Sequence, residues 1–413
     1  MSNTTKKPIA NHNDTQTPIG YKRTAIGVIP IDWDVKKLSD CANILMGQSP
    51  SSTSYNGNGD GFYLIQGNAD IKDRLSSPRI WTNDPTKLCK EGDILMSVRA
   101  PVGTISKSKH TACIGRGICS IKSKEKINQE FLYNFLLSFE SQWKSLEQGS
   151  TFTAVNSNDI MNLQLPIPSI AEQQKIAEIL STWDEAISNC KNTINTLKLR
   201  NKGLSQQLLT GKKRLSGFSE KWEIKKIKDF SLEISSKNKG DEDLIVLSCT
   251  KYNGLVPSLE YFGRKIYSDN LKTYKIVKKN TFAYATNHIE EGSIGYQNKY
   301  ESALISPMYT VFKTDENIND DFLFKVLKSN TYIQEYQKRM EGSIDRRGGL
   351  RWQEFSKIKV SVPSYEEQTA IALALETADQ ELKSYETKLE ALQLQKKGLM
   401  QQLLTGKIRV NVK

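Results

Sequence analysis

Apolar residues recur at alternating spacings of four and three positions along two long stretches of the chain. This is the spacing of heptad a and d positions, kept up for more than four heptads, and it predicts a coiled-coil seam instead of the broader apolar face of an ordinary core helix. The seam positions are Ile176, Leu180, Trp183, Ile187, Cys190, Ile194, Leu197, Leu204 and Leu208 in the first stretch, and Ile371, Leu375, Ala378, Leu382, Tyr385, Leu389, Leu392, Leu399 and Leu403 in the second. The sequence therefore predicts two long helices, over residues 168–211 and 363–406, each about 60 Å long at about 1.5 Å per residue.

The second stretch is a copy of the first. Residues 168–214 align with residues 363–409 without a gap, at a constant offset of 195 positions, and nearly half of the paired residues are identical. The simplest partner for one apolar seam is the other copy. We therefore expect the two helices to pack against each other, with the seam as buried core and not as a cofactor site.

Both predicted helices have recognisable ends. Ser169 with Glu172, and Ser364 with Glu367, have the spacing of a capping box, in which each side chain binds a backbone N–H group at the start of the helix. A glycine at positions 211 and 406 follows the last apolar residue, where a left-handed residue commonly ends a helix.

Unusual residues interrupt both helices at matching positions. Asn201 and Lys396 fill the one polar place in each seam, which leaves two interpretations: they fix the register of the pair, or they lie in solvent near a frayed helix end. Gly203 and Gly398 each cost about 1 kcal/mol relative to alanine inside a helix. Their presence in both copies predicts close approach by another backbone, belonging to the other helix, to a globular segment or to a partner protein.

A mixed α/β segment precedes each long helix, at residues 28–167 and 217–362. In the first, residues 62–71, 92–108 and 112–123 are predicted as strands and residues 127–146 as a helix; in the second, the strands are 244–252, 280–287 and 303–314 and the helix is 318–340. The segments share this order but little sequence, which indicates one scaffold that carries two different recognition surfaces. Residues 1–27 are predicted to be a disordered tail, residues 212–216 a linker and residues 407–413 a second tail.

Composition and charge narrow the class of protein. The 413 residues, 38% hydrophobic and 25% charged, fit a soluble chain of two to four domains, with no apolar run of the roughly 18 residues that a bilayer requires. The six cysteines contain no CxxC pair, which is typical of reduced thiols in a cytoplasmic protein. The net charge of +12 favours a polyanionic partner, but it is spread along the chain without a basic tail, so that a mildly basic solvated surface explains it equally well.

Several motifs together resemble the specificity subunit of type I restriction-modification systems. The likeness covers residues 20–413 and consists of GDILMSVRAPVGTISKS at 92–108, ACIGRG at 112–117, SPMYTVFK at 306–313, the two PxxxEQ helix starts and the two LLTGK endings. The resemblance implies two target-recognition domains, each reading half of a split sequence in double-stranded DNA. It also implies that the paired helices space these domains and dock two methyltransferase subunits, which restriction subunits join.

The duplication agrees with this architecture. Two copies of one helix that pack through the same face run antiparallel about a pseudo-two-fold axis, and the fold class is therefore α+β, with two pseudo-symmetric mixed α/β domains on an antiparallel coiled coil. Since the two globular segments differ in sequence, the half-sites are expected to differ, with a spacer that is measured and not read.

The candidates for DNA contact lie on glycine-punctuated loops. Arg99 is either a reader of bases or phosphates or a structural support for the turn before Pro101, whereas Arg116, between two glycines, is expected to approach DNA closely because little crowds it. Arginine forks suit guanine edges and phosphates. A loop before the last strand of each segment, with Ser150 and Thr151 in the first and Arg346, Arg347 and Arg351 in the second, is predicted to contact DNA, and so is Asn287, which follows a strand.

Motifs for catalysis are absent. The chain has no GxxxxGK[ST] sequence and no Asn/Asp-Pro-Pro-Tyr/Phe stretch, and its three histidines lack metal spacing. We therefore expect a non-catalytic subunit without a metal or cofactor of its own. S-adenosylmethionine, ATP and Mg are expected on the partner methyltransferase and restriction subunits. The competing hypotheses are an enzyme that modifies or cuts DNA alone and a coiled-coil scaffold that binds only proteins.

Overall fold

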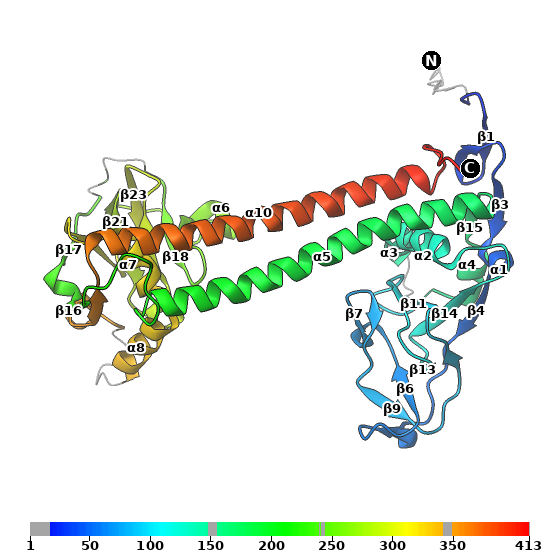
Figure 1. Ribbon diagram of the computed structural model, residues 1–413, viewed down its shortest axis with the longest axis horizontal. Helices are drawn as coiled ribbons and strands as arrows, with labels where there is room; N and C mark the ends of the chain where they lie inside the picture. Colours follow the sequence, from blue (N-terminus) through cyan, green and yellow to red (C-terminus); the bar gives the residue numbers. More distant parts are fainter. Residues whose placement is uncertain (1–16, 148–154, 239, 241–243, 342–348, 413) are drawn as a thin grey trace, which may run out of the picture. The chain divides into compact units, whose positions relative to one another are not determined.

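The computed structural model describes residues 17–147, 155–238, 240, 244–341 and 349–412 (Figure 1). The chain divides into two compact units, one made of residues 1–191 with 387–413 and the other of residues 192–386. Both divisions fall inside the two long helices, α5 (Ile170–Leu208) and α10 (Tyr365–Leu403), which have 39 residues each. Each unit therefore contains one globular segment and half of each long helix.

The helices α5 and α10 lie side by side and run antiparallel, as Figure 1 shows. In the first unit, Lys396 of α10 donates a hydrogen bond of 2.5 Å to Asp184 of α5. In the second unit, Asn201 of α5 donates a hydrogen bond of 2.8 Å to the carbonyl oxygen of Ala378 in α10. Residue numbers rise along one helix as they fall along the other, which confirms the predicted antiparallel pairing.

Apolar burial follows the repeated seam. Ile176 and Leu180 in the first unit, and Ile371 and Leu375 in the second, are at most 2% exposed and join the cores of the globular segments. The remaining seam side chains are buried or half-buried. The two polar seam residues are also buried, Asn201 at 9% exposure and Lys396 at 7%, so the interpretation that places them in solvent is wrong. Both make a specific polar contact across the pair, as a residue that fixes register is expected to do.

The first unit contains two main sheets and a covering pair of helices. The strand orders are β10-β13-β6-β9-β5 and β4-β14-β11-β12-β8-β7. The strands are β4 (Ala42–Met46), β5 (Tyr55–Asn56), β6 (Phe62–Ile65), β7 (Ile71–Lys72), β8 (Leu75–Ser76), β9 (Ile80–Thr82), β10 (Leu88–Cys89), β11 (Ile94–Ser97), β12 (Ile105–Lys107), β13 (Ala112–Ile114) and β14 (Ile118–Ser123). The helices are α1 (Leu38–Cys41), α2 (Gln129–Ser138), α3 (Glu140–Glu147) and α4 (Ser157–Met161). The apolar side chains of α2, Phe131, Leu132 and Leu136, are buried in the same core as Ile94 and Ile121 of the second sheet.

The second unit repeats the central part of this plan. Its four-stranded sheet has the order β17-β24-β21-β22, with two-stranded sheets β20-β23 and β18-β19 beside it. The strands are β17 (Ser231–Ile234), β18 (Leu247–Thr250), β19 (Gly254–Pro257), β20 (Lys275–Lys278), β21 (Thr281–Ala285), β22 (Ile294–Gln297), β23 (Ser302–Ile305) and β24 (Tyr309–Thr314). The helices are α6 (Ser258–Phe262), α7 (Asp320–Leu327), α8 (Asn330–Glu341) and α9 (Trp352–Phe355). The orders match strand for strand, since β17-β24-β21-β22 corresponds to β4-β14-β11-β12 and β20-β23 corresponds to β10-β13.

An entry strand and an exit strand close each segment. In the first unit β3 (Asp34–Lys37) pairs antiparallel with β15 (Gln164–Ile167), and in the second β16 (Glu223–Lys226) pairs in the same way with β25 (Lys359–Val362). Each exit strand leads directly into a long helix.

The PxxxEQ helix starts connect each long helix to its own globular segment. The Oε1 atom of Gln173 accepts a hydrogen bond of 2.8 Å from the backbone N–H of Asn128, which caps α2, and Gln368 makes the same bond to Asn319, which caps α7. The serine half of each predicted capping box is present, at 3.3 Å from Ser169 and 3.4 Å from Ser364. The glutamate half is wrong, because both carboxylate oxygens of Glu172 bind Trp33 and Arg409 instead.

Two other predictions from the sequence need correction. Each predicted globular helix, 127–146 and 318–340, is a pair of helices. The apolar spacing does not reveal the break after α2, because α3 returns Trp143 to the same core. The N-terminal tail is also shorter than predicted, since β1 (Tyr21–Thr24) and β2 (Gly27–Pro30) form a hairpin, and the hydroxyl of Tyr21 donates to the carbonyl oxygen of Gly406.

Candidate functional site

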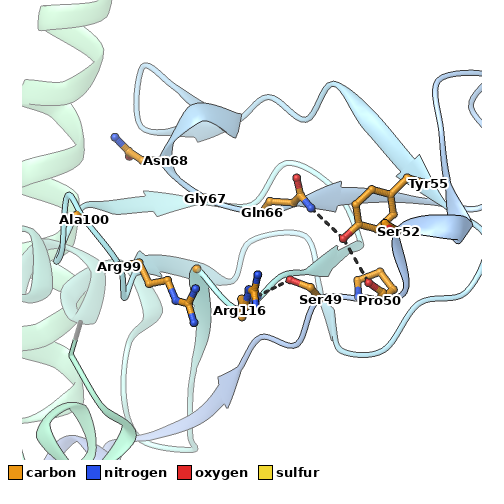
Figure 2. Close-up of a pocket in the computed structure, with 11 residues that line it drawn as sticks. Ser49, Pro50, Ser52, Tyr55, Gln66, Gly67, Asn68, Arg99, Ala100 and Arg116 are labelled. Carbon is orange, nitrogen blue, oxygen red and sulfur yellow. Dashed lines mark hydrogen bonds between the residues drawn. The ribbon is translucent and has the colours of Figure 1, made fainter. Parts of the chain in front are cut away.

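A hollow of about 540 Å³ in the first unit collects two of the arginines selected from the sequence (Figure 2). Arg99 comes from the loop between β11 and β12, and Arg116 from the loop between β13 and β14. The segments that follow β4 and β6 complete the lining, with Ser49, Pro50, Ser52, Gln66, Gly67 and Asn68, together with Tyr55 at the start of β5. The hollow is therefore lined by backbone and by uncharged polar groups around two cations.

Close packing of glycines fixes the loop that carries Arg116. A Cβ atom on Gly117 would lie 2.4 Å from the carbonyl oxygen of Gln66, and one on Gly47 would lie 2.2 Å from the carbonyl oxygen of Gly115. The backbone N–H of Arg116 also donates to Oγ of Ser49 at 3.2 Å. The flanking glycines are therefore buried against neighbouring backbone, whereas the side chain of Arg116 itself is exposed.

Arg99 does not support the turn before Pro101. That turn is held by Ser97, whose Oγ donates to the carbonyl oxygen of Pro101 at 2.6 Å and accepts from the N–H of Thr104 at 2.9 Å. Within the described residues, neither Arg99 nor Arg116 has an ion pair or a side-chain hydrogen bond, and both are exposed. Two unpaired guanidinium groups on rigid loops form a site for an anion or for hydrogen-bond acceptors.

A second hollow, of about 550 Å³, lies at the corresponding place in the second unit. Thr286 and Asn287 line it from the loop between β21 and β22, and Pro307 and Met308 from the loop between β23 and β24. Since β21 and β24 correspond to β11 and β14, these are the topological counterparts of the loops that carry Arg99 and Arg116. The remaining lining residues are Glu233, Lys275, Tyr309, Thr310, Arg351, Trp352 and Gln353.

The two hollows differ in chemistry although their loops correspond. Asn287 lies on the loop of the second unit that corresponds to the Arg99 loop of the first. Met308 lies on the loop that corresponds to the Arg116 loop. Arg351 is exposed at the start of α9, and Lys275 donates to the carbonyl oxygen of Tyr309 at 2.5 Å. Burial lowers the pKa of Lys275. The first hollow therefore presents two arginines, and the second presents an amide, a thioether and one arginine beside Glu233 and Lys275; none of these three arginines has a side-chain ion pair among the described residues.

A glycine with a left-handed backbone positions Asn287. Gly349 has φ of 66°, and a Cβ atom there would lie 2.4 Å from the carbonyl oxygen of Thr286 and 2.5 Å from Oδ1 of Asn287. The N–H of Leu350 donates to the same Thr286 carbonyl oxygen at 2.9 Å. Oδ1 of Asn287 accepts from the hydroxyl of Thr286 at 3.2 Å, and Asn287 is among the residues that line the hollow.

The candidate residues selected from the sequence thus separate into three groups. Arg99 and Arg116 share one hollow, and Asn287 and Arg351 share the other. Ser150, Thr151, Arg346 and Arg347 lie outside the described residues. The sequence analysis missed Ser49, Gln66 and Met308; the SPMYTVFK segment contained Met308, but nothing in its pattern showed that it lines a hollow.

One group of side chains has the composition of a metal site. Within the part of the chain that the structure describes, His288, Glu290 and Glu291 bring possible ligand atoms within 4.8 Å of one another. All three come from one short 3-10 turn, and His288 and Glu291 are exposed. Exposed groups of this kind are common without an ion, so we assign no metal to it.

Comparisons with known proteins give a consistent result. Residues 30–199 and 219–394 match the family model described as "Type I restriction modification DNA specificity domain". The type I restriction enzyme MjaVIII specificity subunit of Methanocaldococcus jannaschii is 25% identical over 92% of this chain and 94% of its own length. The MjaIX specificity subunit of the same organism is 31% identical, but over only 41% of this chain and 42% of its own length.

Solved structures share the fold along nearly the whole chain. The crystal structure of the type I restriction-modification system S subunit from M. genitalium aligns with a TM-score of 0.55 at 16% identity, and covers 93% of this chain and 97% of that one. The HsdS subunit from Thermoanaerobacter tengcongensis aligns with a TM-score of 0.52 at 14% identity, over 92% and 98% of the two chains. None of the helices in the described part of the chain combines the length and hydropathy that crossing a bilayer requires.

Proposed function

The chain belongs to the Type I restriction modification DNA specificity domain family, and we propose that it selects the DNA target of a type I restriction-modification complex. In this role the chain is a non-catalytic subunit of the cytoplasm. Each globular segment reads one half of a split site in double-stranded DNA, and the paired helices set the distance between the halves. The relatives from M. jannaschii carry the name of specificity subunits, which supports this assignment.

The observation that carries the proposal is the pair of corresponding hollows. Loops that follow corresponding strands present two exposed arginines in the first unit, and an asparagine with a methionine in the second. A protein that recognises two different half-sites needs two equivalent surfaces with different hydrogen-bond donors and acceptors, and the two hollows meet this requirement. The proposed target is therefore bipartite and asymmetric.

The side chains favour different bases in the two halves. An arginine fork matches O6 and N7 of guanine, whereas an asparagine amide matches N6 and N7 of adenine, and an apolar side chain contacts the methyl group of thymine. Arg99 and Arg116 therefore favour guanine in the first half-site, and Asn287 with Met308 favours an A·T pair in the second. Phosphate contacts by Arg351 would add affinity without base preference.

Catalysis in this proposal belongs to partner subunits. Two methyltransferase subunits that use S-adenosylmethionine dock on the duplicated helices, and ATP- and Mg-dependent restriction subunits join that complex. A solved chain of the same fold is titled for "complex assembly and conformational transition of the type I R-M system", with a TM-score of 0.57 over 92% of this chain. That likeness supports an assembly with partners, and the repeat of one helix supports two equivalent docking places.

Selection of bound DNA from a random pool tests the proposal. The full chain is combined with its methyltransferase subunit, and bound duplexes are sequenced after competition with nonspecific DNA. We expect two unlike fixed blocks separated by a spacer of constant length and free sequence. A single continuous site, a palindrome or no preference would overturn the proposal, as would methyl transfer from labelled S-adenosylmethionine by this chain alone.

A further inference from the structure

The second hollow contains a carboxylate as well as the asparagine, methionine and arginine already described. Glu233 belongs to the edge strand β17, is exposed, and lines the hollow together with Lys275 and Asn287. Its carboxylate forms no ion pair and no hydrogen bond among the described residues. A carboxylate repels the phosphates of DNA, so a negative charge on a surface that binds DNA weakens binding unless it meets a hydrogen-bond donor there.

The strand register places Glu233 on the face of its sheet where the hollow opens. Glu233 pairs with Phe312 of β24, and paired residues of an antiparallel sheet project from the same face. The ring of Phe312 packs against that of Trp352, with centroids 5.4 Å apart, and Trp352 lines the hollow. Burial raises the pKa of the Tyr284 hydroxyl, and the nearby charge of Glu233 raises this pKa further. The carboxylate therefore lies beside the buried aromatic rings below the hollow.

The first unit has an aliphatic residue at the corresponding position. Ile44 of β4 pairs with Ile121, the fourth residue of β14, just as Glu233 pairs with Phe312, the fourth residue of β24. Ile44 is half-buried and packs against the core of its unit. An inward-pointing charge can protect an edge strand from pairing with another chain, but β4 is also an edge strand and has no charge at this position. Edge protection therefore does not explain Glu233.

The chemistry of a carboxylate limits the base that it can contact. An ionised carboxylate only accepts hydrogen bonds. In the major groove cytosine presents the N4 amino group as a donor, whereas guanine presents two acceptors and thymine an acceptor and a methyl group. Adenine presents its N6 donor beside the N7 acceptor. A carboxylate therefore favours cytosine and discriminates against the other bases through repulsion.

Lys275 reduces the repulsion between this carboxylate and the phosphates. Its ammonium group donates to the carbonyl oxygen of Tyr309 at 2.5 Å, which fixes the position of the charge. Burial lowers the pKa of Lys275, and the charge of Glu233 acts against this effect. The two charges therefore interact without forming an ion pair. A fixed cation near Glu233 makes the potential at the wall less negative, while the carboxylate oxygens stay open to a donor from outside the chain.

We propose that Glu233 selects a cytosine in the second half-site by accepting a hydrogen bond from its N4 amino group. This inference rests on the proposed function. It adds a C·G pair to the A·T pair that Asn287 and Met308 favour, so the second half-site contains both kinds of base pair. Glu233 is then a specificity-determining residue whose charge lowers affinity for DNA in general and raises discrimination at one position.

Glu233→Gln tests the inference, because glutamine keeps the length of the side chain and removes its charge. The complex of the full chain with its methyltransferase subunit is titrated with four duplexes that differ only at the selected cytosine. We expect the original chain to prefer cytosine to adenine by about tenfold or more, as for one good base contact. A glutamine amide matches N6 and N7 of adenine, so the variant should reverse this preference and bind random DNA more tightly. Ratios of affinities do not depend on the fraction of folded protein, so lost stability cannot produce this result.

Removal of the amino group from the DNA gives an independent test. Replacing the selected cytosine with 2-pyrimidinone, which lacks the N4 amino group, should weaken binding of the original chain about tenfold and leave the affinity of Glu233→Ala unchanged. Glu260→Gln is the matched control, since it removes an exposed carboxylate of the same unit outside the hollow, and it should preserve the preference for cytosine.

The inference and the proposed function fail in different ways. A second half-site without cytosine would overturn the inference, and so would a Glu233→Gln variant whose affinity changes by the same factor for all four duplexes. In both cases a split target would still be selected, and the proposed function would stand. If the original chain selects no split target at all, the proposed function itself is wrong.

Discussion

Arg409 binds Glu172, with Nε at 2.8 Å from Oε1 and Nη2 at 3.0 Å from Oε2, and the indole of Trp33 donates to the same carboxylate at 3.0 Å. Arg214 makes the same pair with Glu367 in the second unit, where Trp222 donates at 3.1 Å. In both units the arginine follows the end of one long helix and the glutamate begins the other. Glu172 is 2% exposed, so its buried carboxylate takes its hydrogen bonds from these two partners.

Replacing Arg409 alone should destabilise the first unit more than replacing both Arg409 and Glu172. Arg409→Ala leaves a buried carboxylate with one indole donor, which is expected to cost about 3 kcal/mol, the lower end for a broken buried pair, because the arginine itself is 41% exposed. Glu172→Gln in the same chain removes the stranded charge and should recover part of the loss. Urea unfolding monitored by tryptophan fluorescence measures the cycle.

Arg214→Ala is the matched control for this cycle. Its effect on hydrogen exchange should appear around residues 218–226 of the second unit, whereas that of Arg409→Ala should appear around residues 21–37 of the first. Equal protection of both regions in both variants would contradict the role given to the two pairs.

The sequence predicted the repeated helices well because the residues that define them recur at regular spacings along the chain. Heptad spacing, helix ends and the offset of 195 positions all lie along one dimension, and the antiparallel pairing follows from them by symmetry. The role of Glu172 was not predictable in this way. A serine three residues before a glutamate occurs both when the glutamate caps its own helix and when it binds a distant residue such as Arg409. Local spacing describes neighbours along the chain, and Trp33 and Arg409 are distant in sequence.

The candidate site was predicted only in part for the same reason. Arg99 and Arg116 were selected for their charge and their glycine-rich surroundings, but their meeting in one hollow depends on the pairing of β11 with β14. Met308 carries no charge and lies between Pro307 and the strand residue Tyr309. Its place opposite Asn287 becomes visible only when the strand orders of the two units are compared.

Low pH should destabilise the C-terminal segment of the chain, because it protonates Asp32, which binds Arg409. Its hydrogen bonds to Arg409 hold the pKa of the Asp32 carboxyl below its ordinary value. A carboxyl whose pKa is lowered by folding stabilises the fold above its unfolded pKa, and this contribution is lost as the pH falls through the lower, folded value. Asp32 is 57% exposed, so the contribution is at most about 1 kcal/mol.

Hydrogen exchange of residues 406–412 below pH 4 measures this effect. Asp32→Asn should exchange faster than the original chain at neutral pH and equally fast in acid. Residues 211–217 provide an internal comparison, because Lys221 occupies the place of Asp32 beside Trp222. A difference between the variant and the original chain that persists in acid would count against this account.

Alanine at Arg99 or Arg116 should weaken DNA binding through the first half-site. Loss of a base contact is expected to cost about 1–3 kcal/mol and to relax the preference at one position, whereas loss of a phosphate contact lowers the salt dependence of binding by about one unit of slope. Binding of the complete complex to duplexes with changes in one half-site at a time distinguishes these cases. Lys72→Ala removes an exposed charge of the same unit outside the hollow, and it should leave sequence preference unchanged.

Gly349→Ala should impair reading of the second half-site alone. Its Cβ atom would lie 2.4 Å from the carbonyl oxygen of Thr286 and 2.5 Å from Oδ1 of Asn287, so the loop that carries Asn287 must move. A displacement of that size is enough to break an amide contact to a base, and we expect affinity to fall about tenfold or more, as for loss of one bidentate contact. Changes in the first half-site should be discriminated as before.

Gly263→Ala separates the displaced loop from backbone strain. Gly263 belongs to the same unit and has φ of 62°, close to the 66° of Gly349, but nothing lies within 4 Å of a Cβ atom there. Both substitutions therefore impose similar left-handed strain, which destabilises the unit by a similar amount. Only Gly349→Ala also pushes on Asn287, so only it should change the ratio of affinities for duplexes altered in the second half-site. If Gly263→Ala changes that ratio equally, strain in the second unit is responsible, and the position of Asn287 is not what reads the base.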